Sequence, residues 1–411
     1  MKENWSKYGK SKIKDLIKDL ARSLEGNANE GYVMRAIAGL EVDLNPEISR
    51  KDFLFVVQEV LNKLKLFTLS AAYMQDQFDQ KFKKEQHIIV NYARSLLVIN
   101  EACLIHRLVH DYFDEVESEW LRLELVEILC EAHQWKLAVE KFSRLTYSGN
   151  ASKLKYKKIK SRIEASLLYD KKPDIEVFYI NLDQDLLKRR ELESHLSQTV
   201  ENFTRVPGVL AKTLPSFARS KLHRSHLMTV QVGALGCLLA HISALEKIVE
   251  SEAKVALVLE DDAYFYYKPS QHAVNAILAN DFDLIYVNSR MMRRDQAWER
   301  PFNAEPIASR LSVLPDEQSG WGGDGYILTK AGAQMLLDNF SNDLGLGHFD
   351  GQLGSYGLIG ADFTPENKAQ KIGASFVSRF SKKSTHIRCG CLDFPLVSVK
   401  PYVGSSRVEN S

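Results

Sequence analysis

Disulfide-forming cysteine, long apolar runs and an excess of one charge are all missing from this sequence. Five cysteines in 411 residues are too few, and odd in number, for a disulfide framework, which favours a reducing compartment. No run approaches the ~20 apolar residues of a membrane span, and the lysine-rich N-terminal segment lacks the apolar stretch of a signal peptide. We therefore expect a cytoplasmic protein.

The balance of charge limits the choice of partner. The 54 basic and 53 acidic residues leave a net charge of +1, so no overall field attracts nucleic acid. With 45% hydrophobic and 26% charged residues, the composition is that of a folded globular protein. A length of 411 residues favours two domains, at roughly 150 residues for each.

Proline is nearly absent from the first part of the chain. Between residues 45 and 169 it occurs only at position 46, and apolar residues recur three and four positions apart, the helical spacing. The segment 119–145 predicts two helices with a turn at His133 and Gln134. We expect residues 1–172 to form an all-helical domain, either an irregular bundle or a helical repeat of roughly 33 to 35 residues, that binds the acceptor or a protein partner.

The pattern changes at Pro173, which cannot continue a helix. Short apolar runs at 175–182, 255–259 and 283–287 predict buried strands, and the segment 235–249 predicts a helix between two of them. This alternation indicates an α/β sheet within residues 173–411, with its ligand site at the carboxyl ends of the strands.

Three acidic residues, Glu260, Asp261 and Asp262, directly follow the apolar run 255–259. Adjacent carboxylates repel one another unless a counter-charge neutralises them. A loop at the end of a buried strand can hold such carboxylates around a divalent cation. The alternative is an acidic turn exposed to solvent.

Polar and basic residues also surround the end of the first predicted strand. Asn181 and Leu182 end that strand, and Arg189 and Arg190 lie near the start of the next helix. Backbone amides at a helix N-terminus together with basic side chains can bind an anion. An ordinary turn with a solvated basic face explains the same residues.

A glycine-containing segment opens the predicted helix 235–249. Gly233 permits close approach of the backbone, and His241 lies further along on the helical spacing. The glycines are not spaced as in a dinucleotide-binding fingerprint. His241 is either a buried, hydrogen-bonded helix residue or part of a ligand site.

Taken in order, these segments resemble one family. The strings FYINLD, GALGCLLAHISAL, VLEDDA and GGDGYILTKAGAQMLL are similar to glycosyltransferase family 25, the lipopolysaccharide-type galactosyltransferases, over residues 175–380. The resemblance implies a Rossmann-like domain of the GT-A type, preceded here by the helical domain. It also implies an inverting transferase that moves a sugar, typically galactose, from a UDP-sugar to a glycan or glycolipid acceptor such as lipopolysaccharide or lipooligosaccharide.

The resemblance also suggests roles for the acidic cluster. A diphosphate leaving group requires charge stabilisation, which Mn²⁺ or Mg²⁺ supplies, and such hard cations prefer carboxylate ligands. We expect Asp262, helped by Asp261, to hold the metal, and Glu260 and Asp261 to contribute to donor binding. His386 is a further candidate ligand, because a late histidine contacts the metal in some related folds.

Inversion requires one general base near the acceptor hydroxyl. Asp350 and Asp324 are the candidates, and Asp350 matches the later acidic position of the family. Each could instead form a turn beside a glycine. The glycine-rich loop around Trp321 and Gly323 could close over a donor, with the indole ring stacking on a sugar or base, or it could be a tight structural turn.

Two other classes of protein remain as alternatives. A nucleotidyltransferase would need a glycine-rich, basic signature after the first strand, where this chain has NLDQDLLKRR. A scaffold that has lost activity would not need the acidic cluster. Alternating lysines at 153–160 form a local basic patch, which predicts weak peripheral contact with an anionic membrane at its inner face, or else a solvated linker.

Overall fold

A computed structural model of the chain describes fourteen continuous segments and two single positions. They are residues 15, 37, 50–63, 66–81, 85–99, 101–145, 153–167, 172–214, 232–267, 269–291, 302–314, 322–342, 348–362, 365–380, 384–393 and 395–399, with the helix assignment at 15 and 37 standing alone. The chain divides into two compact units, with the boundary in the sequence between Ile163 and Glu164.

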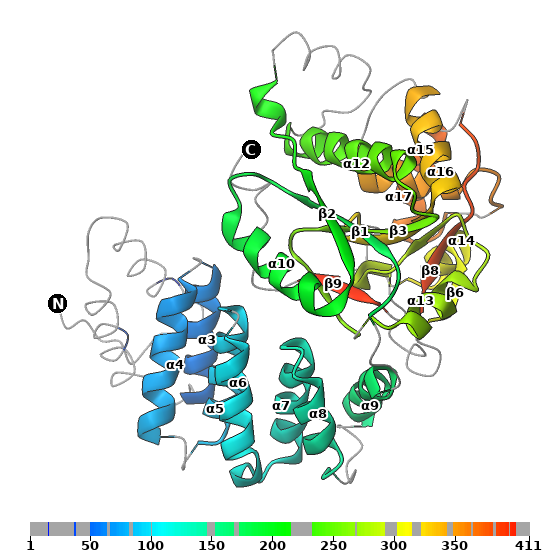
Figure 1. The fold of residues 1–411 in the computed structure, drawn as a ribbon. Coiled ribbons are helices and arrows are strands. Elements are labelled where there is room, and N and C mark those ends of the chain that lie inside the picture. The colour runs from blue at the N-terminus through cyan, green and yellow to red at the C-terminus, as the bar shows by residue number, and fades with distance from the viewer. Residues whose placement is uncertain are drawn as a thin grey trace. The chain divides into compact units, whose positions relative to one another are not determined.

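The first unit consists of helices in its described part (Figure 1). They are α3 (Arg50–Lys63), α4 (Phe67–Lys81), α5 (His87–Val98), α6 (Ala102–Tyr112), the 3₁₀ helix η3 (Phe113–Glu115), α7 (Glu119–Glu131), α8 (Trp135–Phe142) and α9 (Lys153–Leu167). Apolar side chains from these helices, such as Ile89, Leu129 and Ile159, form one buried cluster. Burial of that cluster is what keeps helices of this length folded, because isolated helices shorter than about 12 to 15 residues are marginal in water.

The turn between α7 and α8 falls where the sequence predicts it. Ser118 caps α7 by accepting a hydrogen bond from the backbone of Leu121 at 3.4 Å. After α7, His133 adopts a positive φ of 56°, which reverses the chain before α8. The prediction of a turn at His133 and Gln134 is therefore confirmed.

Two lysines of the expected basic patch are neutralised inside the helical unit. Lys155 forms ion pairs with Glu124 and Glu127, the latter at 2.7 Å, and Lys158 pairs with Glu127 at 2.7 Å. Burial opposes ionisation of Glu127, but the two lysines outweigh it and lower the pKa of Glu127 to about 2. These two positive charges therefore act within the fold.

The second unit contains a seven-stranded sheet in the order β2-β1-β3-β7-β5-β8-β6. Its strands are β1 (Glu176–Asn181), β2 (Asn202–Pro207), β3 (Val255–Glu260), β5 (Leu284–Tyr286), β6 (Ala304–Pro306), β7 (Gly325–Thr329) and β8 (Cys389–Leu392). Five strands share one direction, whereas β7 runs against its neighbours β3 and β5, and β6 runs against β8. A separate pair joins β4 (Ala263–Phe265) to β9 (Val397–Val399).

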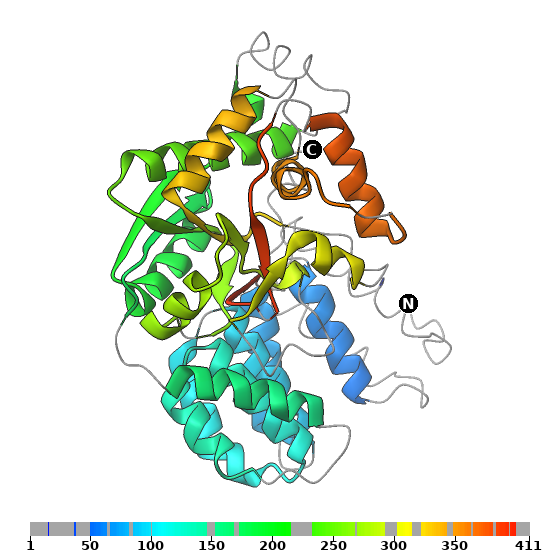
Figure 2. The same ribbon diagram turned by 90° about the vertical axis from the view of Figure 1, so that its right-hand side faces the viewer.

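Helices cover both faces of the sheet (Figure 1). They are α10 (Leu186–Thr199), η4 (Ala211–Thr213), α12 (Val232–Glu250), α13 (Gln271–Leu278), η5 (Ser289–Met291), α14 (Ile307–Ser312), α15 (Lys330–Asn342), α16 (Phe349–Gly357) and α17 (Lys368–Phe380). Figure 2 shows α15 to α17, coloured orange, together on one side of the sheet. Alternate strand residues supply two cores: Val258 packs with α12 and α15, whereas Leu257 packs with α10 and α13.

The structure confirms the expected α/β class for this unit. The predicted strands 175–182, 255–259 and 283–287 correspond to β1, β3 and β5, and the predicted helix 235–249 lies within α12. Thr329 caps α15, as its hydroxyl accepts a hydrogen bond from the amide of Gly332 at 2.9 Å. Within the described part of the chain, no helix has the length and apolar character needed to cross a bilayer.

Candidate active site

Strand register brings the acidic cluster beside the end of β1. Ile180 pairs with Glu260 in the parallel ladder of β1 and β3, so Asn181 and Asp261 follow at the same edge of the sheet. Strand β7 is antiparallel to β3, with Gly325 opposite Leu259. The residues before β7, including Asp324, therefore reach the same edge from the opposite chain direction.

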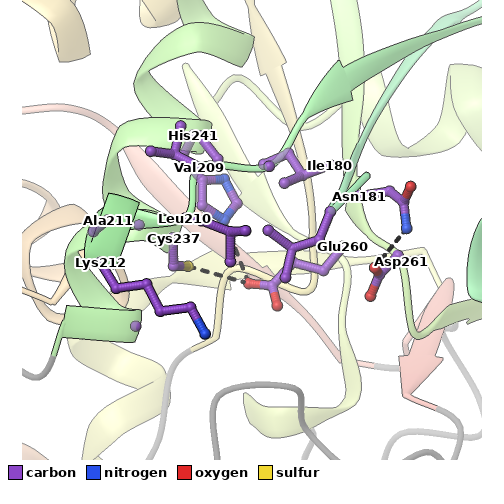
Figure 3. Close-up of a pocket in the computed structure, with 15 residues that line it drawn as sticks. Ile180, Asn181, Val209, Leu210, Ala211, Lys212, Cys237, His241, Glu260 and Asp261 are labelled. Carbon is purple, nitrogen blue, oxygen red and sulfur yellow. Dashed lines mark hydrogen bonds and ion pairs between the residues drawn. The ribbon is translucent and has the colours of Figure 1, made fainter. Parts of the chain in front are cut away.

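A pocket lies at this edge (Figure 3). The end of β1, the segment after β2, the first half of α12 and the end of β3 contribute its lining, which is Ile180, Asn181, Leu182, Gly208, Val209, Leu210, Ala211, Lys212, Gly233, Gly236, Cys237, Ala240, His241, Glu260 and Asp261. Gly236 is required for this shape, because a Cβ there would lie 2.2 Å from the carbonyl oxygen of Val209. The close approach holds α12 against the wall of the pocket.

Six of the expected donor-binding residues line this pocket. They are Asn181, Leu182, Gly233, His241, Glu260 and Asp261. Asn181 is oriented by its own contacts: its amide donates to Asp261 Oδ2 at 2.9 Å, and its backbone oxygen accepts from Arg205 at 3.0 Å. The sequence placed these residues near one ligand, and the structure places them around one cavity.

Asp261 is held by two groups from the first strand-to-helix connection. It accepts the Asn181 hydrogen bond on one oxygen, and Lys188 Nζ lies 3.4 Å from the other. Burial nevertheless raises the pKa of Asp261, with Lys188 and Asn181 acting in the opposite direction. Asp261 is therefore a fixed, partly neutralised wall of the pocket.

Asp262 has a different environment. Its Oδ1 atom is shielded from solvent and has no hydrogen-bond partner. Burial, followed by repulsion from Glu260, Asp324 and Asp261, raises the pKa of Asp262 to about 7. A divalent cation fits this position, because it would supply the missing partner and offset the repulsion among the carboxylates.

His241 is buried and oriented from both sides. Its Nδ1 atom lies 3.0 Å from the hydroxyl of Tyr326, and its ring stacks on Phe349 with centroids 3.8 Å apart. Its Nε2 atom lies 3.4 Å from Glu260 Oε1, and the thiol of Cys237 lies 3.7 Å from the same oxygen. Cys237 was not predicted as a site residue, although its position four residues before His241 puts both on one helix face.

The two candidate bases have different surroundings. Asp324 is buried and receives two hydrogen bonds from the Arg290 guanidinium, of which the Nη2–Oδ1 contact is 2.7 Å. Asp350 is half-buried in the first turn of α16, and its Oδ1 atom accepts a hydrogen bond from the Gly323 amide at 2.8 Å. Arg290 thus engages both oxygens of Asp324.

Other expected residues lie away from the pocket or outside the described residues. Arg189 pairs with Glu193 at 3.0 Å along α10, and Arg190 is exposed. His386 is exposed and precedes β8, whose Cys389 pairs with Leu284 at the start of β5, so it lies at the opposite edge from Asp261 and Asp262. Trp321 lies outside the residues that the structure describes.

Gly323 provides a direct test of this arrangement. A Cβ there would lie 2.9 Å from His241 Nε2 and 3.1 Å from Asp350 Oδ1, so Gly323→Ala should displace one of these groups. We expect turnover per folded molecule to fall by roughly 10-fold or more, because small misplacements of reacting groups are costly. Steady-state kinetics combined with thermal unfolding would measure it.

The matched control is Gly332→Ala in α15. A Cβ at Gly332 would lie 2.6 Å from the Asp283 carbonyl oxygen, a clash at the start of β5 and away from the pocket. This variant should lose stability and keep the turnover of its folded fraction. Equal turnover losses in both variants would show that Gly323 acts only through general stability.

Comparison with known proteins shows which family this part of the chain resembles. Residues 174–344 match the family model "Glycosyltransferase family 25 (LPS biosynthesis protein)". This range contains the pocket, the acidic cluster and Asp324. This part of the chain is therefore similar to glycosyltransferase family 25, as the resemblance of its motifs indicated.

Individual relatives are more distant. A "Glycosyltransferase 25 family member" from Anopheles gambiae is 27% identical over 195 residues, which is 43% of this chain and 31% of that protein. "Procollagen galactosyltransferase 1" from Danio rerio is 28% identical over 141 residues, 33% of this chain and 22% of that protein. "Procollagen galactosyltransferase 2" from Homo sapiens is 25% identical over 181 residues, 39% and 27% of the two chains. The match thus spans less than a third of each of these relatives.

Proposed function

We propose that this protein transfers galactose from UDP-galactose to a hydroxyl group of a glycan acceptor such as lipopolysaccharide or lipooligosaccharide, with inversion at the sugar. The family 25 domain and the two relatives named as galactosyltransferases support the reaction class. The observation that carries the proposal is the buried, unpartnered Oδ1 of Asp262 beside a pocket at the carboxyl ends of β1 and β3. Such an edge is where α/β sheets bind nucleotides.

The pocket residues would bind and orient the donor. Mn²⁺ or Mg²⁺, when bound, supplies positive charge to the diphosphate leaving group. Asp262 would hold this ion, with the substrate phosphates completing the shell, since Mg²⁺ is commonly held by one or two carboxylates plus phosphates. Asp261, fixed by Asn181 and Lys188, would position the nucleoside side of the donor.

Asp350 would act as the general base. It lies in the first turn of α16, at the positive end of the helix dipole. The Gly323 amide fixes one oxygen at 2.8 Å, which orients the carboxyl group toward the region of His241. The proton of the acceptor hydroxyl would pass to Asp350 as that oxygen attacks the sugar from the face opposite the diphosphate.

The proposal gives each of the two units a role. A GT-A-type catalytic domain would occupy the second unit, and the helical unit would bind the acceptor or a protein partner. Contact of the protein with an anionic membrane in the cytoplasm stays a prediction. Lys155 and Lys158 would contribute less positive charge to that contact than the sequence suggested, because both pair with glutamates.

A donor-hydrolysis screen tests the proposed reaction. The full chain is incubated with UDP-galactose, UDP-glucose and UDP-N-acetylglucosamine, each with Mn²⁺ and with excess EDTA, and released UDP is measured. We expect release to be fastest with UDP-galactose and to be abolished by EDTA. Full release in EDTA would contradict the metal requirement, and absence of release with every donor would favour a binding protein.

A further inference from the structure

We propose that Cys237, His241 and Glu260 form a second metal site, one that binds Zn²⁺ in the wall of the pocket. The site goes beyond the proposed function, which uses a hard cation at Asp262. Among the residues that the structure describes, these three are the one group of three or more His, Cys, Asp or Glu side chains whose ligand atoms all lie within 4.8 Å of one another.

Local structure brings the three ligands together. Cys237 and His241 are four residues apart on α12, so their side chains project from the same face of the helix. Glu260 ends β3, and its carboxylate approaches this part of α12. Figure 3 shows the Cys237 and His241 side chains converging on the Glu260 carboxylate. The close packing of Gly236 on Val209 fixes the height of α12 above the sheet.

Two of the three distances between the ligand atoms match those of a tetrahedral zinc shell. Zinc binds thiolate sulfur at about 2.3 Å and imidazole nitrogen or carboxylate oxygen at about 2.0 to 2.2 Å, which sets sulfur–oxygen and nitrogen–oxygen separations of about 3.5 and 3.3 Å. The Cys237 Sγ–Glu260 Oε1 distance is 3.7 Å, and the His241 Nε2–Glu260 Oε1 distance is 3.4 Å. The Cys237 and His241 ligand atoms lie within 4.8 Å of each other, so adjustment of these two side chains would complete the shell.

The surroundings of His241 suit a metal ligand. Its Nδ1 atom lies 3.0 Å from the Tyr326 hydroxyl, so donation of the Nδ1 proton to that oxygen would leave the Nε2 lone pair for the metal. Stacking on Phe349 holds the ring plane. Gly323 keeps space open next to Nε2, because a Cβ there would lie 2.9 Å from that nitrogen.

The ligand types distinguish this site from the one at Asp262. A thiolate with an imidazole selects zinc, whereas carboxylates with phosphates and water select magnesium or manganese. All three ligands line the pocket, so the fourth position faces its interior and would hold water. Zinc binding would release the thiol proton of Cys237 to solvent.

Cobalt substitution tests the ligand set directly. The full chain, free of metal, is titrated with Co²⁺, and the near-ultraviolet thiolate-to-cobalt absorption is recorded. We expect about one thiolate-bound ion per chain. The band should disappear in Cys237→Ser and persist in Cys103→Ser, which removes an exposed cysteine of the helical unit, and in Cys391→Ser, which removes a buried one in β8. A band that survives Cys237→Ser, or no band at all, would overturn the proposal.

Zinc affinity gives a second, independent measurement. Competition with a chromophoric chelator should show weaker zinc binding in His241→Ala and Glu260→Gln, and a roughly 10- to 100-fold loss in Tyr326→Phe through the Nδ1 contact. Asp262→Asn should retain the zinc affinity, so the result does not depend on transferase activity. Equal zinc affinity in wild type, His241→Ala and Glu260→Gln would mean that these side chains only hydrogen-bond one another.

Discussion

Asp262→Asn is expected to abolish most sugar transfer while leaving the fold intact. Asparagine keeps the size of the side chain and removes the charge that would hold the cation on the diphosphate. Metal ions contribute several kcal/mol to such steps, so we expect a loss of roughly 10² to 10³-fold in kcat/KM. Transfer assays over a range of Mn²⁺ concentrations would measure it. Undiminished transfer would remove Asp262 from the metal site.

The same substitution should stabilise the protein in the absence of metal. The pKa of Asp262 in the folded chain is raised from 3.8 to about 7, so its ionisation destabilises the fold as the pH rises between these values. Asparagine does not ionise. The melting temperature of Asp262→Asn in EDTA should therefore match that of the wild type near pH 4 and exceed it by a growing margin up to about pH 7. The matched control is Asp281→Asn, which changes an exposed aspartate. It should leave the activity unchanged and should not show the pH-dependent gain in melting temperature.

Asp350→Asn is expected to lower kcat much more than donor affinity. A general base acts in the transition state and contributes about 10² to 10⁴-fold, and the amide cannot take a proton. Donor binding, measured by titration with UDP-galactose, should stay close to wild type because the proposed contacts of Asp350 are with the acceptor. A pH–rate profile of the wild type should show one ionisation that the variant lacks.

Asp324→Asn separates the two candidate bases. Two nitrogens of the Arg290 guanidinium donate hydrogen bonds to the Asp324 carboxylate. Removing the charge of Asp324 should therefore lower the stability of the protein, while the folded fraction keeps its turnover. If Asp324→Asn instead lowered kcat selectively and Asp350→Asn did not, their roles would have to be exchanged.

The helices and strands that could be predicted from the sequence are those with a continuous pattern of buried apolar residues. Strand β3 is an unbroken apolar run because both of its faces are covered, and the turn at His133 interrupts a clear helical period. Strands β2 and β8 could not be predicted, for two different reasons. Strand β2 is a half-exposed edge with alternating polar residues, and β8 is only four residues long with a glycine inside it.

The limits at the candidate site have the same origin. Glu260, Asp261 and Asp262 could be identified because they directly follow a strand, and Asn181 because it ends one. The Cys237–Glu260 contact could not, since it depends on how α12 packs over β3. The Arg290–Asp324 pair likewise depends on β7 running against β5, which brings two loops of opposite chain direction to one edge. Sequence spacing records neither arrangement.

The position of β8 affects how the protein can be made. Strand β8 lies between β5 and β6, yet Tyr286 pairs with Cys391, near the end of the chain. During synthesis, β5 and β6 leave the ribosome well before their common neighbour, and until β8 arrives each has an unpaired edge. The sheet therefore stays incomplete until β8 has been synthesised, and we expect the slowest folding step to be the insertion of this late strand.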